Sequence, residues 1–346
     1  MKFCPNCGNK IQVEGVKFCY ECGYKLPQIE SKATETAKAP APKVQEKLKN
    51  ATVEDGVLIE YTGKDENVVI PGSIKVIGEC AFVDNLTLKS VVISEGVTEI
   101  ESSAFDGCKN LKSVVIPKTV KVIGAGAFTR CALESLELPE GVEKIEDEAF
   151  SECEKLKSIK LPNTLVELGE SVFVNASAPS VKVPASVKEI GKCAFWGIAV
   201  EVDPANKYYK SVAGHLFSKD GTVLCSYNSR NTLTSYVVPN GVKRISEEAF
   251  SYATYLKNLV VASTVEAIEE CAFEGCKELI GISLLDGLKE IMPSAFDGCK
   301  KLPALIIPKT VDYIGHFSGC DALTTIYVGK GKKYTQLPNG INVIEY

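Results

Sequence analysis

Hydrophobic residues recur through most of the chain at an interval longer than any helix or strand period. Phenylalanine marks this interval at Phe82, Phe105, Phe128, Phe150, Phe173, Phe195, Phe250, Phe273, Phe296 and Phe317. Successive gaps are 23, 23, 22, 23, 22, 55, 23, 23 and 21 residues. A period in the twenties indicates a solenoid, in which each repeat packs only on its neighbours. We therefore expect stacked repeats over residues 51–346.

Within one repeat, the hydrophobic positions predict a short strand, a return wall and a buried plug. The stretch ending at Phe128 reads Leu-Lys-Ser-Val-Val-Ile-Pro-Lys-Thr-Val-Lys-Val-Ile-Gly-Ala-Gly-Ala-Phe. Alternation in its first six residues is typical of a strand, and Pro117 suits the strand exit because it cannot donate to a continuing ladder. The inward positions are Leu111, Val114 and Ile116, then Val120 and Ile123 on the opposite wall.

Cysteines fall mainly at two positions of the repeat. Three residues after the plug stands a small residue: Cys108, Cys131, Cys153, Ala176, Ala253, Cys276, Cys299 and Cys320. Two residues before it stand Cys80, Cys193 and Cys271, whereas Cys225 fits neither column. A small, weakly polar thiol suits a buried bend, so we interpret these ten cysteines as packing residues. The alternatives are a second metal site or a reactive thiol.

These repeats resemble the leucine-rich repeats of BspA-like proteins, whose consensus is near L-x-x-I-x-I-P-x-x-V-x-x-I-G-x-x-A-F-x-x-C. The resemblance covers residues 55–330 and extends over ten copies of the repeat. It implies a leucine-rich repeat solenoid with one short parallel β-strand per repeat on the concave face. Members of this family are associated with adhesion and protein binding, and many are exposed on the surfaces of bacteria and protists.

The gap between Phe195 and Phe250 interrupts the period. Its sequence predicts a β-hairpin insertion near residues 199–235, with a turn at Lys219-Asp-Gly-Thr222 flanked by alternating residues. One interpretation is a structural splice between two blocks of solenoid. The other is an island that contacts a ligand, for which Tyr208, Tyr209 and Tyr227 are suitable residues.

The N-terminal 26 residues carry a separate motif. Cys4 and Cys7 form one C-x2-C pair, Cys19 and Cys22 form another, and eleven residues separate the pairs. Two such turns present four thiolates at tetrahedral positions, which is the closed geometry of structural Zn²⁺. The segment resembles the short zinc-ribbon domains at the N-termini of many bacterial proteins. Residues 27–50 are rich in Ala, Lys, Glu and Pro and read as a flexible linker.

Outward strand positions are the candidate binding surface. One column comprises Val69, Val92, Val115, Glu137, Lys160, Lys182, Val237 and Val260, and continues as Ser283, Ile306 and Tyr327. The neighbouring column is mostly serine. Small hydroxyls stacked in register would hydrogen-bond one another and fit a crowded concave surface, so this column needs no function to explain it. Contiguous exposed valines mark interaction sites more often than single ones, so we expect a protein or peptide ligand. Strand propensity alone is the alternative explanation.

Charge and missing motifs narrow the class of function. The net charge is −5, and because residues 1–26 and 27–50 each carry +2, the repeats carry −9. Such a body is a poor surface for phosphates, so nucleic acid is an unlikely partner. With two histidines and none of the common catalytic motifs, we expect no enzyme.

Three hypotheses remain for the function. The first is a non-enzymatic protein-interaction scaffold with the zinc ribbon as a tethering module. The second is a cell-surface adhesin, and the third is a nucleic-acid-associated regulator acting through the ribbon. The chain shows no membrane span and no signal peptide, which favours a cytoplasmic location over export by a non-classical route.

Overall fold

The structure is a computed structural model that describes residues 2–3, 10–11, 48–334, 336–337 and 340–346. The chain divides into two compact units, residues 1–44 and residues 45–346. In the first unit, β1 (Lys2–Phe3) pairs with β2 (Lys10–Ile11) in an antiparallel manner. Cys4, Cys7, Cys19 and Cys22 lie outside the described residues, as does the linker up to residue 47.

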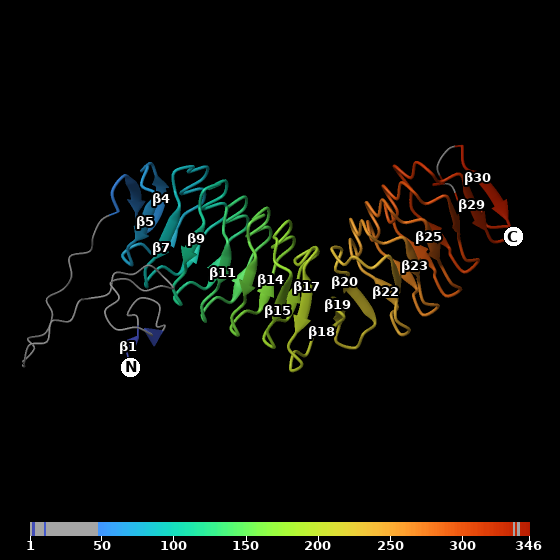
Figure 1. The fold of residues 1–346 in the computed structure, drawn as a ribbon, viewed down its shortest axis with the longest axis horizontal. Helices are drawn as coiled ribbons and strands as arrows, with labels where there is room; N and C mark the ends of the chain where they lie inside the picture. Colours follow the sequence, from blue (N-terminus) through green and yellow to red (C-terminus); the bar gives the residue numbers. More distant parts are fainter. Residues whose placement is uncertain (1, 4–9, 12–47, 335, 338–339) are drawn as a thin grey trace, which may run out of the picture. The chain divides into compact units, whose positions relative to one another are not determined.

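The second unit is a β-solenoid whose rungs follow one another along its axis (Figure 1). Each regular rung contributes a longer strand to one parallel sheet and a two-residue strand to another. The repeat pattern predicted the longer strand, but not the shorter one. Two residues are too few to produce an alternating pattern, so the shorter strand appears in sequence only as an inward residue such as Ile123.

The longer strands form four parallel sheets, in chain order. These are β5 (Asn67–Ile70), β7 (Ser90–Ile93) and β9 (Ser113–Val115); β11 (Ser135–Glu137), β13 (Ser158–Lys160), β15 (Ser180–Val183) and β17 (Ala199–Val202); β21 (Ser235–Val237), β23 (Asn258–Val260) and β25 (Gly281–Ser283); and β27 (Ala304–Ile306), β29 (Thr325–Val328) and β30 (Asn342–Glu345). Their inward residues are mostly buried and their outward residues mostly exposed, as in β15.

The short strands form two further sheets. The first contains β4 (Val57–Tyr61), β6 (Val76–Ile77), β8 (Glu99–Ile100), β10 (Val122–Ile123), β12 (Lys144–Ile145), β14 (Glu167–Leu168) and β16 (Glu189–Ile190), with antiparallel β3 (Ala51–Glu54) at its edge. The second contains β20 (Val223–Ser226), β22 (Arg244–Ile245), β24 (Ala267–Ile268), β26 (Glu290–Ile291) and β28 (Tyr313–Ile314), extended by antiparallel β18 (Tyr209–Val212) and β19 (His215–Ser218).

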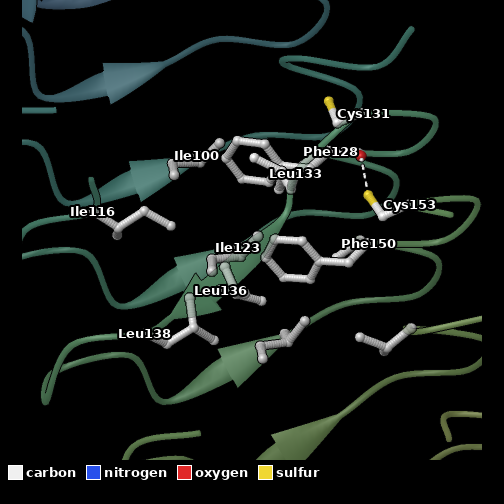
Figure 2. Close-up of a cluster of buried hydrophobic side chains, with 14 of the residues drawn as sticks. Ile100, Ile116, Ile123, Phe128, Cys131, Leu133, Leu136, Leu138, Phe150 and Cys153 are labelled. Carbon is white, nitrogen blue, oxygen red and sulfur yellow. Dashed lines mark hydrogen bonds between the residues drawn. The ribbon is translucent and has the colours of Figure 1, made fainter. Parts of the chain in front are cut away.

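The recurring phenylalanines stack in the core. Phe105 and Phe128 are 5.0 Å apart between ring centroids, and Phe128 and Phe150 are 5.3 Å apart, with interplanar angles of 5° and 1°. Figure 2 shows these rings packed against Ile123 and Leu136 from the two walls. All the recurring phenylalanines are buried. The prediction that this residue plugs each rung is confirmed.

Two columns of left-handed backbone flank the plug. The residue two positions before it has positive φ in nearly every rung, as at Ser103 (55°) and Glu148 (57°). So does the residue two positions after it, as at Arg130 (60°). The amides at these positions and at the plug itself donate to carbonyls of the next rung. This ladder holds backbone that L-residues otherwise avoid, at a cost of about 1–3 kcal/mol each.

Two tyrosines begin two separate stacks, one from Tyr61 to Phe195 and one from Tyr227 to Phe317, and both tyrosines were missed in the sequence. Tyr61 donates its amide to the Ala81 carbonyl at 2.8 Å, and Tyr227 donates to the Ala249 carbonyl at 2.7 Å. Phe128 makes the same bond to Ala149 at 2.8 Å. Tyr61 stacks 4.8 Å from Phe82, and Tyr227 stacks 4.6 Å from Phe250. With the ten phenylalanines, these residues make twelve plugs.

The gap from Phe195 to Phe250 therefore contains one complete rung, which corrects its interpretation as a single long insertion. It divides at Tyr227 into steps of 32 and 23 residues. That rung is built from β17, β20 and Tyr227, and the extra residues are β18 and β19 between them. Beside the turn predicted at residues 219–222, a second turn at Ala213-Gly214 joins β18 to β19.

Both tyrosine rungs have the same unusual start. The inward leucine of the short strand stands three positions before the plug, Leu58 before Tyr61 and Leu224 before Tyr227, whereas Ile123 stands five positions before Phe128. In both, an antiparallel strand with a register shift pairs with the short strand. The second part of the solenoid thus begins as the first does.

Replacing Phe128 by alanine should lower the free energy of unfolding by about 3–5 kcal/mol, because the ring is fully buried between two others. Urea unfolding followed by circular dichroism measures the change. The control is Lys118→Ala on the exposed surface of the same rung, which should stay within about 0.5 kcal/mol. An unchanged unfolding midpoint for Phe128→Ala would refute the role of the plug.

Candidate binding surface

Strand register aligns the outward residues of the longer strands within each of the four sheets, and we call these residues together the strand-face row. In the first sheet Val69 pairs with Val92, and Val92 pairs with Val115. Val69 is 60% exposed, and the other two valines are half-buried. Adjacent strands lie about 4.8 Å apart, so these side chains form one continuous apolar strip.

The middle of the strand-face row is charged. Glu137 pairs in register with Lys160, Lys160 with Lys182, and Lys182 with Glu201. The Lys160 ammonium forms an ion pair with the Glu137 carboxylate, and both side chains are 71% exposed. Ion pairs this exposed contribute little to stability. These four residues therefore form a polar band that the fold does not require.

Beyond the band the row becomes apolar again. Val237, Val260 and Ser283 are in register on β21, β23 and β25. Ile306, Tyr327 and Ile344 are in register on β27, β29 and β30. Val237 is 63% exposed and Ile306 is 53% exposed. The column predicted from the sequence ended at Tyr327. The structure adds Ile344 on β30, which was missed because the sequence of this strand does not match the repeat.

A hollow of about 650 Å³ lies at the N-terminal end of this row. It is lined by Val69, Pro71 and Tyr61, among other residues. The Tyr61 hydroxyl donates to Asp65 at 2.6 Å, which fixes the ring at the edge of the hollow. The valine strip and the hollow form one surface, large enough to receive side chains of a partner.

Hydroxyl stacking explains little of the serine column beside the row. Ser90 donates to the Asn67 side chain at 2.6 Å. Ser113, Ser135, Ser158 and Ser180 are exposed, and among the described contacts their hydroxyls have no partner. Small size, rather than mutual hydrogen bonding, is what the column shares.

The three tyrosines of the inserted region do not share a surface. Tyr208 is 46% exposed. Tyr209 is half-buried, and its hydroxyl accepts a hydrogen bond from the Ile190 amide at 3.2 Å. Tyr227 is 2% exposed and stacks in the core, so its expected role as a ligand contact is wrong. Tyr227 had the same appearance in sequence as an exposed tyrosine because the Ala-Phe signature of the plug is replaced by Ser226-Tyr227.

The cysteines three residues after the plug are packing residues, but Cys80 is exposed, which corrects its interpretation as a packing residue, and Cys193, Cys225 and Cys271 are half-buried. In the column after the plug, each thiol donates to the backbone carbonyl of the plug in the previous rung. Cys153, which follows Phe150, donates in this way to the Phe128 carbonyl at 3.2 Å (Figure 2). Burial raises the pKa of Cys108 and of Cys153 to about 12, so both remain thiols at neutral pH. Among the described residues, no group of three or more His, Cys, Asp or Glu residues is placed to hold a metal ion.

The two histidines lie in unrelated surroundings. His215 is 1% exposed and stacks 4.4 Å from Tyr227, and its Nδ1 accepts the Asn228 amide at 3.1 Å. Burial lowers the pKa of His215 to about 4, so the ring is neutral at pH 7. His316 is exposed and lies 3.0 Å from the Ser294 hydroxyl. His215 is thus part of the core of the inserted rung.

A match to known families covers most of the chain. Residues 60–132, 75–200 and 225–340 match the BspA type leucine rich repeat region, in six copies. Residues 3–26 match a zinc-ribbon domain. A comparison with curated proteins finds no match. Within the described residues, no helix has the length and apolar character needed to cross a membrane.

Solved structures with the same fold come from several bacteria. The pneumococcal vaccine antigen PcpA is 24% identical, with a TM-score of 0.74, and the match covers 88% of this chain and 98% of PcpA. A leucine rich cell surface protein from Faecalibacterium prausnitzii is 26% identical, with a TM-score of 0.68 and coverages of 89% and 96%. A leucine-rich repeat protein from Eubacterium ventriosum is 24% identical, with a TM-score of 0.64 and coverages of 80% and 75%.

The buried, neutral His215 should make stability depend on pH in a defined window. Its pKa of about 4 in the fold lies below the ordinary value of 6.5, so the unfolded chain takes up the proton first. As the pH falls from 6.5 to 4, the stability that His215 contributes should decline, by about 3 kcal/mol at most.

The measurement is urea unfolding of the natural chain and of His215→Gln at several pH values between 7 and 4. The advantage of the natural chain should shrink across this window, since the glutamine does not titrate. A constant difference between the two proteins at every pH would contradict the assignment of a neutral, buried ring.

Proposed function

Because the chain belongs to the family of BspA-type leucine-rich repeat proteins, we propose that it is a non-enzymatic scaffold that binds a protein or peptide. The binding surface in this proposal is the strand-face row. The observation that supports it is the composition of the row, which is apolar in the first sheet, charged in the second and apolar in the third, with the residues of each sheet in register. Repeat solenoids use such long surfaces to engage extended partners.

The composition of the row indicates the chemistry of the partner. Val69, Val92 and Val115 at one end and Val237, Val260 and Ile306 at the other offer apolar contacts. The polar band at Glu137, Lys160 and Lys182 offers both signs of charge, which gives specificity more than affinity. A partner that fits has two apolar patches separated by a polar segment. The exposed Tyr208 adds a further contact beyond the row in this proposal.

A cell-surface adhesin is the second candidate, and one observation favours it. The structure from F. prausnitzii, 26% identical over 89% of this chain, is called a cell surface protein. Protease treatment of intact cells distinguishes the candidates, because only a protein displayed outside would be degraded. A scaffold inside the cell would survive until the cells are lysed.

Zinc is the proposed cofactor of the N-terminal segment. The match of residues 3–26 to a zinc-ribbon domain supports Cys4, Cys7, Cys19 and Cys22 as its ligands. Four thiolates fill the tetrahedral positions of Zn²⁺, so the ion would serve a structural purpose and leave no position for water. We infer that this segment acts as a tethering module beside the solenoid.

Val237→Glu combined with Ile306→Glu should weaken partner binding by about a hundredfold, because each change places a charge on an apolar contact. The control is Val53→Glu, also an exposed strand valine but outside the row, which should bind normally. A photo-crosslinking residue at position 237 identifies the partner, and affinity measurements with that partner then rank the variants. Equal binding by all variants would exclude the strand-face row as the binding surface.

The purified chain should contain one zinc ion, and Cys4→Ser should lose it, because three thiolates bind far more weakly than four. Elemental analysis measures the metal. Chelation should remove the zinc while the far-ultraviolet spectrum of the solenoid stays the same, since residues 45–346 form their own compact unit. Loss of the solenoid signal together with the metal would contradict an independent ribbon.

A further inference from the structure

The tyrosine rung leaves a hollow on the side of the solenoid that carries the plug turns. Because the turn leading to Tyr227 is shortened, the turn of the Phe195 rung contacts that of the Phe250 rung directly. The Cys193 thiol lies 2.9 Å from the Glu248 carboxylate, across 55 residues of sequence. A hollow of about 360 Å³ opens between these two turns. That volume is within the range of small-molecule sites.

Aromatic rings form part of the lining. Trp196 and Tyr252 meet edge to face, with centroids 6.2 Å apart and an interplanar angle of 81°. The Trp196 indole donates its N–H to the Ser251 carbonyl at 3.1 Å, which fixes the orientation of the ring. Arg230, which does not line the hollow, lies 5.8 Å from the indole centroid. The indole therefore already accepts one cation–π contact within the chain.

The lining carries one formal charge among the described residues, the carboxylate of Glu248. Its side-chain contact is the Cys193 thiol, and burial and the hydrogen bond to Glu248 raise the pKa of that thiol to about 12, so the thiol remains neutral. The neighbouring Lys192 is engaged by Glu247 at 2.9 Å. A part-buried carboxylate without a cationic partner is costly unless a cation joins it.

Neutral oxygen atoms complete the lining. Ser171 and Asn175 face the hollow, and the Asn175 amide nitrogen donates to Glu152 at 2.8 Å, so the Asn175 oxygen can accept. Hydrogen-bond acceptors favour a cation that carries N–H donors over a quaternary one. An aromatic ring face, a carboxylate and such acceptors together match the head of a lysine side chain.

We propose that the hollow lined by Trp196, Tyr252 and Glu248 binds a primary ammonium group, supplied by a lysine side chain of a partner protein. This site goes beyond the proposed function, because it lies on the plug turns and not on the strand-face row. The ammonium would contact the Glu248 carboxylate while its methylene chain lies against the two rings.

The chain itself supplies the reporter for a test, because Trp196 is its single tryptophan. Butylammonium serves as the probe, pentanol as the neutral analogue and tetramethylammonium as the cation without N–H donors. Butylammonium should change the tryptophan emission saturably, pentanol should not, and tetramethylammonium should bind more weakly. Saturation-transfer NMR of the probe's methylene protons provides a second readout that does not depend on the emission.

Glu248→Gln should weaken butylammonium binding by about tenfold, the loss expected for one charge-assisted contact. Glu148→Gln is the matched control, because Glu148 occupies the same position of another rung, with φ of 57° against 55°. If Glu248→Gln fails to fold, Tyr252→Ala, at an exposed ring, replaces it with the same expected loss. Absence of binding by both readouts, equal binding of pentanol or tetramethylammonium, or equal losses at positions 148 and 248 would overturn the proposal.

Discussion

The stack of buried plugs is the constraint on which the rest of this structure depends. Within each of two stacks, one from Tyr61 to Phe195 and one from Tyr227 to Phe317, neighbouring plugs are joined by ring contacts, and most are also joined by an amide that donates to the next rung. The amide bond fixes register at the turn, and the ladders of the two walls carry that register to the strands. Left-handed backbone on both sides of the plug is tolerated because the ladder holds it. The alignment of the strand-face row is a consequence of this core.

Much of the fold could be predicted from residue spacing. The period located ten plugs, their thiol neighbours and the outward valines, because each occupies a constant position relative to Phe. Tyr61 and Tyr227 escaped because the residue type changes and the Ala-Phe signature is absent, with Glu60 and Ser226 before the two plugs. The spacing from Leu224 to Tyr227, identical to that from Leu58 to Tyr61, was one available signal. The 23-residue step from Tyr227 to Phe250, equal to the phenylalanine period, was a second signal.

The two candidate sites differ in how many of their residues can be identified from the sequence. Members of the strand-face row lie on successive repeats, so counting residues is enough to collect them. The hollow joins Trp196 to Tyr252 and Glu248 across the Tyr227 rung, and only the three-dimensional path brings them together. The single tryptophan of the chain, beside a plug, was the one hint. Tyr227 is the opposite case: the sequence suggested a surface residue, and its burial shows that it belongs to the core.

The repeated start of the two solenoid blocks has a consequence for how this architecture can change over time. A short antiparallel strand and a tyrosine rung occur at the beginning and again at the middle. Each block therefore carries its own beginning, and gene duplication or deletion of whole rungs would leave both beginnings intact. Evolution can then lengthen either apolar end of the row, or the charged middle, without redesigning the core. The length of the candidate binding surface can therefore change by one rung at a time.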